Sequence, residues 1–151
     1  RPLGVPCPVY PAKGYSATFR VLNPLAAPEV SLIDQGEKLV FSRFGDYLRM
    51  AGTAEIGGYS RALNTRRCNN LVQRAREMFP RALDFDNVRF WSGLRPTSPS
   101  NIPLIGRTAL RNLYLNTGHG SLGWTMGAGS GRALADLVSD RKPEVDFPFL
   151  G

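Results

Sequence analysis

Cysteine, histidine and long hydrophobic runs are scarce in this sequence. The 151 residues include two cysteines, Cys7 and Cys68, with no C-x-x-C pair, and a single histidine, His119. A metal site needs three or four such ligands, so none is expected. Two isolated cysteines favour reduced thiols of an intracellular protein over a disulfide. No apolar run approaches the roughly 20 residues of a membrane span, and no signal peptide is visible, so we expect a cytoplasmic protein.

Positive charge dominates, with 19 lysines and arginines against 12 acidic residues and a net charge of +7. Many of the arginines lie at 61–81, where the apolar residues recur at helical spacing and leave the arginines on the solvent side. This pattern is compatible with a solvated helix face, or with a surface that meets nucleic acid or anionic lipid. No aromatic residues alternate with the arginines, which argues against a base-stacking platform. The arginines are Arg61, Arg66, Arg67, Arg74, Arg76 and Arg81.

The length is that of one average domain, and the first residue, Arg1, is not methionine, so we expect a part of a longer chain. Antiparallel strands are predicted in the first half, with a kink at Pro11 and Gly14 that divides the first of them in two. The helix predicted at 64–79, which Pro80 ends, is the natural cover for one face of such a sheet. The strand segments lie at 9–21, 30–34, 39–44 and 47–55.

The second half begins with a strand at 88–91, followed by a proline- and hydroxyl-rich loop at 92–103. Within the loop, Arg95 precedes a proline, so its backbone is restricted and its side chain can be aimed. An arginine held in this way can bind a carboxylate or phosphate through two parallel hydrogen bonds. The alternative is an arginine that binds carbonyl groups of its own loop.

A glycine-rich stretch at 118–131 lies between an apolar strand at 112–117 and an apolar helical pattern at 131–138. Its first glycines have the G-x-G-x-x-G spacing that lets a backbone approach a phosphate or a planar cofactor. Strand, glycine turn and helix bring free N–H groups and the positive end of a helix to one point. The alternative is a tight structural turn in which glycine supplies positive φ.

A complete dinucleotide-binding fold does not follow from this pattern. Such a fold continues into a second strand that carries an acidic residue about 20 residues after the glycines. Glu144 lies near that distance, but Pro148 interrupts the segment that would form the strand. The glycine-rich stretch is therefore expected to be an isolated cofactor contact at most.

Five motifs, spread in order over almost the whole chain, resemble the FAD-dependent D-amino acid oxidase superfamily, and within it the bacterial D-amino acid dehydrogenases (small subunit). The last residues, 146–151, look untypical. The motifs are Val9-Tyr10-Pro11 with Lys13-Gly14-Tyr15-Ser16, Gly45-Asp46-Tyr47-Leu48-Arg49 with Ala51-Gly52-Thr53-Ala54-Glu55, Gly93-Leu94-Arg95-Pro96-Thr97, Pro103-Leu104-Ile105-Gly106 and the stretch 118–131.

The resemblance implies an α+β fold made of two incomplete parts. Residues 1–87 would belong to a substrate-binding domain with an antiparallel or mixed sheet and a covering helix. Residues 88–151 would supply the strand, glycine turn and helix of an FAD-binding domain whose N-terminal dinucleotide-binding segment is not in this sequence. The isolated chain is therefore expected to be inactive.

The implied activity is oxidative deamination of D-amino acids, with hydride transfer from Cα to FAD and electrons passing to a quinone or another respiratory-chain acceptor. A related flavin oxidase or dehydrogenase acting on glycine, sarcosine, proline or another amine is the alternative. The arginine-rich helix would then contact the inner face of the plasma membrane peripherally, and nucleic acid is not an expected partner. A basic module that binds nucleic acid or membrane is a more distant alternative.

The resemblance also assigns the site. Arg95 would bind the substrate carboxylate, and Tyr15 and Tyr10 would wall the substrate pocket, although both tyrosines are equally compatible with a sheet core. His119 would lie beside the flavin ring rather than act as a base. The implied flavin-binding residues are Gly118, His119, Gly120, Ser121, Leu122, Gly123, Trp124 and Thr125.

Overall fold

The computed structural model describes residues 3–151, which form two compact units. The sheet unit comprises Lys13–Leu94, and the glycine unit comprises Arg95–Gly151 together with the described residues before Lys13. No helix among the described residues is both long enough and apolar enough to cross a membrane.

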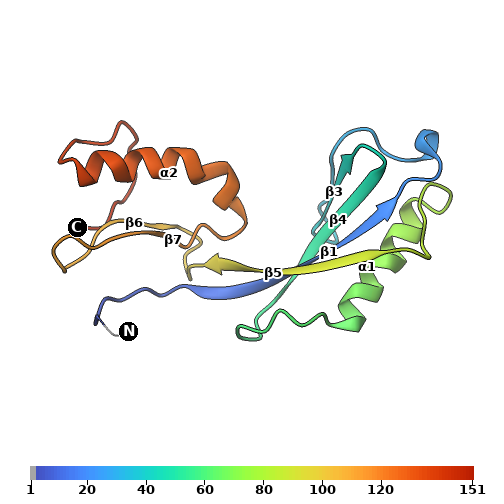
Figure 1. The fold of residues 1–151 in the computed structure, drawn as a ribbon, viewed down its shortest axis with the longest axis horizontal. Helices are drawn as coiled ribbons and strands as arrows, with labels where there is room; N and C mark the ends of the chain where they lie inside the picture. The colour runs from blue at the N-terminus through green and yellow to red at the C-terminus, as the bar shows by residue number, and fades with distance from the viewer. Residues whose placement is uncertain (1–2) are drawn as a thin grey trace. The chain divides into compact units, whose positions relative to one another are not determined.

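The sheet has five strands in the order β2-β3-β4-β1-β5 (Figure 1). Antiparallel pairing joins β2 to β3, β3 to β4 and β4 to β1, so hairpins build most of it. The first residues of β1 and the last residues of β5 belong to the glycine unit. The strands are β1 (Tyr10–Arg20), β2 (Leu32–Asp34), β3 (Leu39–Phe44), β4 (Tyr47–Glu55) and β5 (Arg89–Thr97).

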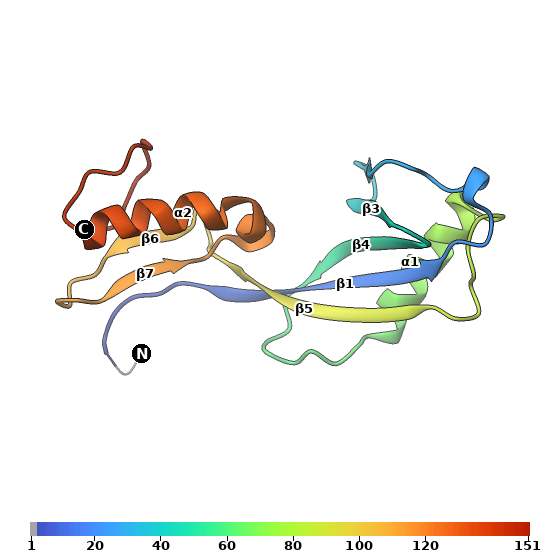
Figure 2. The ribbon, with the colours of Figure 1, turned by 45° about the horizontal axis from the view of Figure 1, so that its top comes forward.

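One face of the sheet is covered by α1 (Thr65–Met78), as the two views of the ribbon show (Figure 1, Figure 2). Asn64 caps the helix: its side-chain oxygen accepts a hydrogen bond from the N–H of Arg67 at 3.2 Å, which satisfies a donor that the first turn leaves unpaired. The helix contributes its apolar stripe to a core filled by inward-facing strand residues. The buried core includes Tyr15, Ala17, Phe19, Phe41, Leu48, Met50, Cys68, Leu71 and Ala75.

In the glycine unit, β6 (Leu104–Arg107) pairs antiparallel with β7 (Tyr114–Thr117), and η2 (Gly120–Leu122) leads into α2 (Gly123–Val138). The C-terminal segment returns to β6, where the N–H of Leu150 donates to the carbonyl of Ile105 at 2.8 Å. A Cβ on Gly106 would lie 2.4 Å from the carbonyl oxygen of Leu150, so this return requires glycine at that position.

The predicted hairpin, the strand before the glycine-rich stretch and the helix at 64–79 are confirmed, and with them the α+β class. Three predictions were wrong in extent. Residues 9–21 contain one strand, because a shift in the pairing register between Lys13 and Tyr15 absorbs the predicted kink. The strand predicted at 88–91 continues to Thr97 in place of a loop, and α2 begins at Gly123 rather than near residue 131. The division at residues 87 and 88 stays a prediction.

A buried carboxylate attaches the C-terminal segment to α2. Asp136 accepts a hydrogen bond from Nε of Arg141 at 3.0 Å and pairs with Nε of Arg132 at 3.3 Å. The hydrogen bond from Arg141 is the largest cause that holds the pKa of Asp136 below its ordinary value of 3.8. The charged form is therefore the stabilising one.

We expect Asp136→Asn to loosen this segment in the complete protein. The amide keeps the shape of the carboxylate but loses the charge that holds Arg141, so trypsin should cut after Arg141 several times faster. Because the pKa is lowered in the folded state, the contribution of Asp136 is present above pH 3.8 and is lost as the pH falls further. Asp146→Asn, which changes an exposed carboxylate of the same segment, is the control; equal cleavage of the two variants would contradict the prediction.

Candidate functional site

The chain turns sharply where β7 meets the glycine-rich stretch. Gly118 and Gly120 have φ values of +83° and +56°, in the left-handed region that favours glycine. Gly118 is buried, and a Cβ built there would lie 3.5 Å from side-chain atoms of Ser98 and Val9. Backbone conformation, more than lack of space, therefore requires glycine at this turn.

His119 lies between these two glycines and is half-buried. Its Nε2 atom is buried and has no hydrogen-bond partner among residues 3–151. Buried polar atoms are almost always paired in folded proteins, so this nitrogen is suited to a partner that the chain itself does not supply.

The N-terminus of α2 is the second feature of this region. No side chain caps it, and its first turn contains no acidic residue. The first N–H groups of a helix have no partner within it, and about half a positive charge at the helix end favours negative charge in a ligand. Trp124, in the first turn, is 99% exposed, and Leu122 beside it is also exposed. The helix end therefore offers both hydrogen-bond donors and apolar surface.

Arg95 is connected to the glycine turn through its own strand. Thr97, two residues further along β5, forms an isolated antiparallel bridge with His119. A Cβ on Gly120 would lie 3.8 Å from Oγ1 of Thr97, so the Thr97 side chain faces the turn. Alternate residues of a strand share a face, which puts the half-buried Arg95 on the side of β5 that borders Gly120.

Tyr10 belongs to the same unit as the glycine turn. It is exposed, and Val9, the preceding residue, lies against Gly118. The structure thus places Tyr10, Arg95 and the stretch from Gly118 to Thr125 in one unit, with Val9 against the glycine turn. Thr97 and Ser98, which also border the turn, were not identified from the sequence, although Thr97 lies in the Gly-Leu-Arg-Pro-Thr motif.

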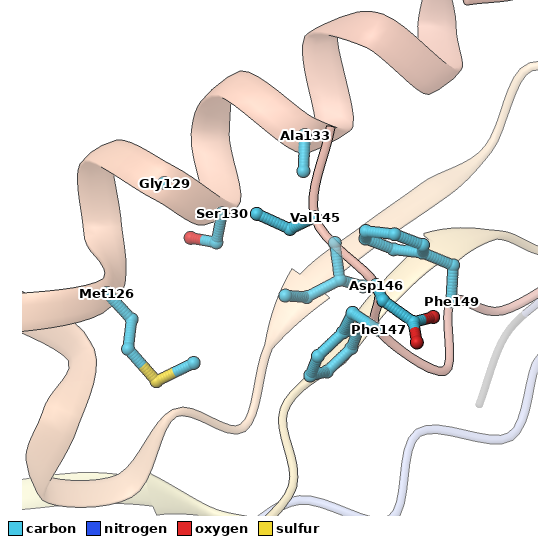
Figure 3. Close-up of a pocket in the computed structure, with 9 residues that line it drawn as sticks. Met126, Gly129, Ser130, Ala133, Val145, Asp146, Phe147 and Phe149 are labelled. Carbon is cyan, nitrogen blue, oxygen red and sulfur yellow. The ribbon is translucent and has the colours of Figure 1, made fainter. Parts of the chain in front are cut away.

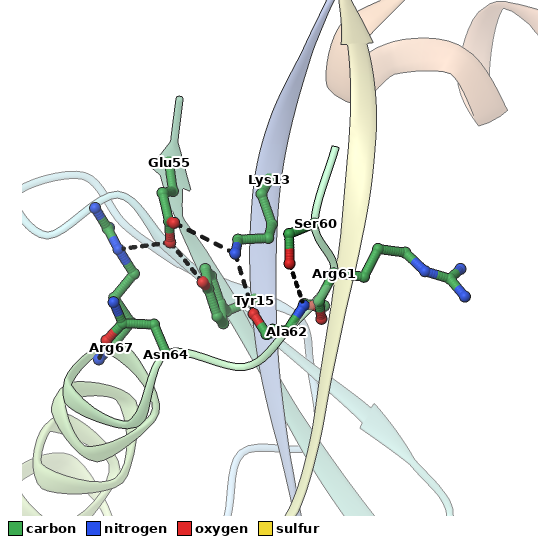
Figure 4. A network of polar contacts seen from close by, with 9 residues as sticks. Lys13, Tyr15, Glu55, Ser60, Arg61, Ala62, Asn64 and Arg67 are labelled. Carbon is green, nitrogen blue, oxygen red and sulfur yellow. Dashed lines mark hydrogen bonds and ion pairs between the residues drawn. The ribbon is translucent and has the colours of Figure 1, made fainter. Parts of the chain in front are cut away.

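Tyr15 belongs to the sheet unit and is 1% exposed. Its hydroxyl donates to Oε2 of Glu55 at 2.5 Å, within a cluster that we call the Glu55 network: Lys13, Tyr15, Glu55 and Arg67 (Figure 4). Lys13 Nζ lies 3.3 Å from Oε1 of Glu55, and Arg67 Nε lies 3.2 Å from Oε2. The role of Tyr15 as a wall of the substrate pocket stays a prediction.

The charges of this network reinforce one another. The hydrogen bond from Tyr15, followed by those from Lys13, holds the pKa of Glu55 below its ordinary value. The side chain of Lys13 is almost completely buried, and its pKa is raised, mainly by a hydrogen bond with Tyr15 and then by Glu55. Lys13 Nζ also donates to the carbonyl of Ala62 at 3.0 Å, so the network holds the segment between β4 and α1.

Most arginines of α1 are engaged within the chain. Arg67 pairs with Glu55, and Arg74 contacts both Asp34 and Glu77 at 2.9 Å. The guanidinium of Arg76 lies 4.2 Å from the ring centre of Phe85. Carboxylates therefore neutralise Arg67 and Arg74, two of the four arginines of α1, whereas Arg76 stacks on a ring and keeps its charge.

An apolar cavity of about 260 Å³ lies between α2 and the C-terminal segment (Figure 3). Met126 and Ala133 of α2 face Val145 and Phe147 across it, and none of the predicted site residues lines it. The hydroxyl of Ser130 donates to the carbonyl of Gly127 at 3.3 Å, so it offers no free donor to a ligand.

Comparison with known proteins identifies close relatives along the whole chain. It is 57% identical to a D-amino acid dehydrogenase of Dechloromonas aromatica (strain RCB) over 150 residues, which cover 99% of this chain and 36% of that protein. It is 54% identical to a D-amino acid dehydrogenase of Paramagnetospirillum magneticum over 151 residues, again 36% of the relative. The chain thus spans little more than a third of the length of these curated relatives.

Solved structures agree with the fold. Glycine oxidase from Geobacillus kaustophilus superposes with a TM-score of 0.83 at 26% identity, over 97% of this chain and 39% of that one. L-proline dehydrogenase from P. horikoshii superposes with a TM-score of 0.77 at 16% identity, over 95% of this chain and 39% of that one, and shows the fold alone.

The family model described as "FAD dependent oxidoreductase" matches residues 1–137. FAD is the cofactor of that family, and the glycine turn offers what a flavin ring needs: a backbone without side chains at Gly118 and Gly120, an unpaired Nε2 on His119 and an uncapped helix end. The residues therefore fit the cofactor, and the chain belongs to the family of FAD-dependent oxidoreductases.

Proposed function

We propose that the complete protein is a flavin-dependent dehydrogenase that oxidises D-amino acids, with residues 88–151 in its FAD-binding domain and residues 1–87 in its substrate-binding domain. The supporting observation is that the left-handed glycine turn, the uncapped end of α2 and Arg95 itself belong to one unit. When bound, FAD supplies the acceptor for the hydride that leaves Cα of the substrate.

Different residues of this chain would then bind the flavin and the substrate. The N–H groups at the start of α2, with residues 118–125 around them, would stabilise negative charge on the pyrimidine side of the flavin. Arg95 would bind and orient the substrate carboxylate, and Tyr10 and Tyr15 would wall the pocket. The neutral amine of the substrate needs no buried base for hydride loss, so His119 has a positioning role beside the ring.

The names of the relatives support a dehydrogenase rather than an oxidase, and hence a quinone or another respiratory-chain acceptor reached by peripheral contact with a membrane. The second candidate is a flavin oxidase or dehydrogenase whose substrate is glycine, sarcosine, proline or another amine. The similarity to glycine oxidase favours it, because that fold carries the same units at 26% identity.

The test uses the complete protein, whose visible spectrum is recorded before and after D-alanine is added without oxygen. We expect a flavin absorption band that bleaches with D-alanine. A band that is indifferent to D-alanine, D-methionine and D-phenylalanine but bleaches with glycine, sarcosine or proline would favour the second candidate. A protein without flavin, even after FAD is added, would overturn the proposal.

Gly118→Ala tests the glycine turn in the complete protein. Alanine at this left-handed position costs about 1–2 kcal/mol and shifts the backbone that would lie against the flavin, so we expect weaker FAD binding. Gly45→Ala is the matched control, because Gly45 also has positive φ (+56°) and open space around it but lies in the turn between β3 and β4. FAD titration should separate the two variants; equal affinities would contradict a flavin contact at Gly118.

A further inference from the structure

The face of the sheet opposite α1 carries aromatic and arginine side chains. Leu48 and Met50 of β4 point into the core, so Tyr47 and Arg49 point to the opposite face. The pairing register places Phe44 of β3 beside Tyr47. On β5, the exposed Arg89 and Trp91 alternate with inward-facing residues in the same way. We call Phe44, Tyr47, Arg49, Arg89 and Trp91 the aromatic–arginine face.

Stacking across β1 holds this face together. The guanidinium of Arg89 lies 4.6 Å from the ring centre of Tyr47, and that of Arg49 lies 5.4 Å from the ring centre of Trp91. Because β1 lies between β4 and β5, each pair reaches over the middle strand. A cation beside a ring keeps its full charge, whereas a cation paired with a carboxylate does not.

Charge pairing differs only in part between the two faces. Within residues 3–151, neither Arg49 nor Arg89 takes part in an ion pair. On α1, Arg67 and Arg74 pair with carboxylates, whereas Arg66 and Arg76 are in no ion pair within the same residues. The aromatic–arginine face also exposes large apolar groups, since Phe44 is 60% exposed and Trp91 is 56% exposed. It therefore combines apolar rings with positive charge that no carboxylate neutralises within the described residues, 3–151.

We propose that the aromatic–arginine face is the surface by which the enzyme contacts an anionic lipid bilayer. Tyrosine and tryptophan favour the boundary between headgroups and acyl chains, and arginine binds lipid phosphates. A second copy docked through the same face would bring arginines against arginines, which disfavours a symmetric dimer there. The inference rests on the proposed function, in which electrons leave for a respiratory acceptor, and moves the membrane contact from α1 to the opposite face of the sheet.

The test is partitioning of the complete, FAD-loaded enzyme onto vesicles of phosphatidylcholine and phosphatidylglycerol in equal parts, with pure phosphatidylcholine vesicles for comparison. The variant Arg49→Gln/Arg89→Gln removes two charges from the aromatic–arginine face. Each arginine near an anionic surface contributes about fivefold to the affinity, so this double variant should bind anionic vesicles about 25-fold more weakly than the wild type. The matched control, Arg66→Gln/Arg76→Gln, removes the same charge from α1 and should bind like the wild type. Phe44→Ser should weaken binding without any change of charge.

Flavin bleaching by D-alanine is measured on every variant, so that the proposed function is tested separately. Equal losses of vesicle binding in both double variants would indicate net charge alone and overturn the proposal, as would a larger loss in the α1 variant. If D-alanine bleaches the flavin band of the wild-type enzyme but the enzyme does not bind anionic vesicles, the membrane proposal is overturned and the proposed function is left intact. Variants of the face that lose FAD or thermal stability while still binding vesicles would show that the rest of the protein covers this face, which also overturns the proposal.

Discussion

Arg95→Ala in the complete enzyme is expected to lower kcat/KM for D-alanine by about a hundredfold or more, mainly through a higher KM. Two parallel hydrogen bonds from a guanidinium to a carboxylate are each worth about 1.5–3 kcal/mol, and a loss of about 3 kcal/mol exceeds a factor of one hundred. Arg95→Lys should also be poor, because an ammonium group cannot reproduce the planar pair of donors. Steady-state kinetics with an artificial electron acceptor measures both variants.

A substrate analogue separates substrate binding from a purely structural role of Arg95. D-Alaninamide lacks the carboxylate, so the wild-type enzyme should use it poorly and Arg95→Ala should reduce its turnover little further. If Arg95 instead holds carbonyl groups of its own segment, the substitution should impair both substrates equally and lower the thermal stability. Arg111→Ala, which removes an exposed arginine near β7 in the same unit, is the control and should leave KM unchanged.

The elements that the sequence predicted well are those with local signals. Asn64 before α1, the apolar stripe within it and Pro80 after it all lie within or beside the helix. The end of β5 has no such signal, because Gly93, Pro96 and the hydroxyl residues around them are typical of a loop. Pairing with β1, which is more than 70 residues away in the sequence, makes it a strand. Tertiary pairing overrides local preference here.

The start of α2 was missed for a related reason. Glycine costs a helix about 1 kcal/mol relative to alanine, so the segment from Gly123 to Gly131 is a poor helix by propensity alone. Packing of Ser130 and Ala133 against the rest of the unit makes it helical. The glycine pattern predicts a turn over residues 118–131; Gly118 and Gly120 form one, whereas the chain is helical from Gly123.

At the candidate site, the motifs predicted individual residues but not which residues contact one another in space. Arg95 stood out because a proline follows it, whereas the bridge between Thr97 and His119 joins positions that no periodicity relates. One residue of the Glu55 network, Lys13, could have been recognised from the sequence alone. Lys13 lies in an otherwise uncharged segment of β1, and a lysine buried there requires a carboxylate partner.

Glu55→Gln is expected to destabilise the sheet unit. The amide removes the charge that faces Lys13, which is 5% exposed and would keep its ammonium group buried without a carboxylate. The melting temperature should fall by several degrees. The segment that Lys13 holds through Ala62 should also loosen, so that trypsin cuts faster after Arg61. Glu37→Gln, in the exposed turn between β2 and β3, is the control and should leave both measurements unchanged.

The pH dependence of this difference identifies the charged network as its cause. The folded-state pKa of Glu55 is lowered from 4.5, so its contribution is present above that pH and is lost as the pH falls through the folded-state value. The pKa of Lys13 is raised from 10.5, so its contribution is present below that pH and is lost as the pH rises through its own folded-state value.

The difference in melting temperature between wild type and Glu55→Gln should therefore be constant from about pH 5 to about pH 10 and shrink in acid. Tyr15→Phe removes the largest cause of the lowered pKa of Glu55, so its acid transition should begin at higher pH. A difference that stays constant down to about pH 2 would mean that the shape of the side chain, and not its charge, stabilises this part of the sheet.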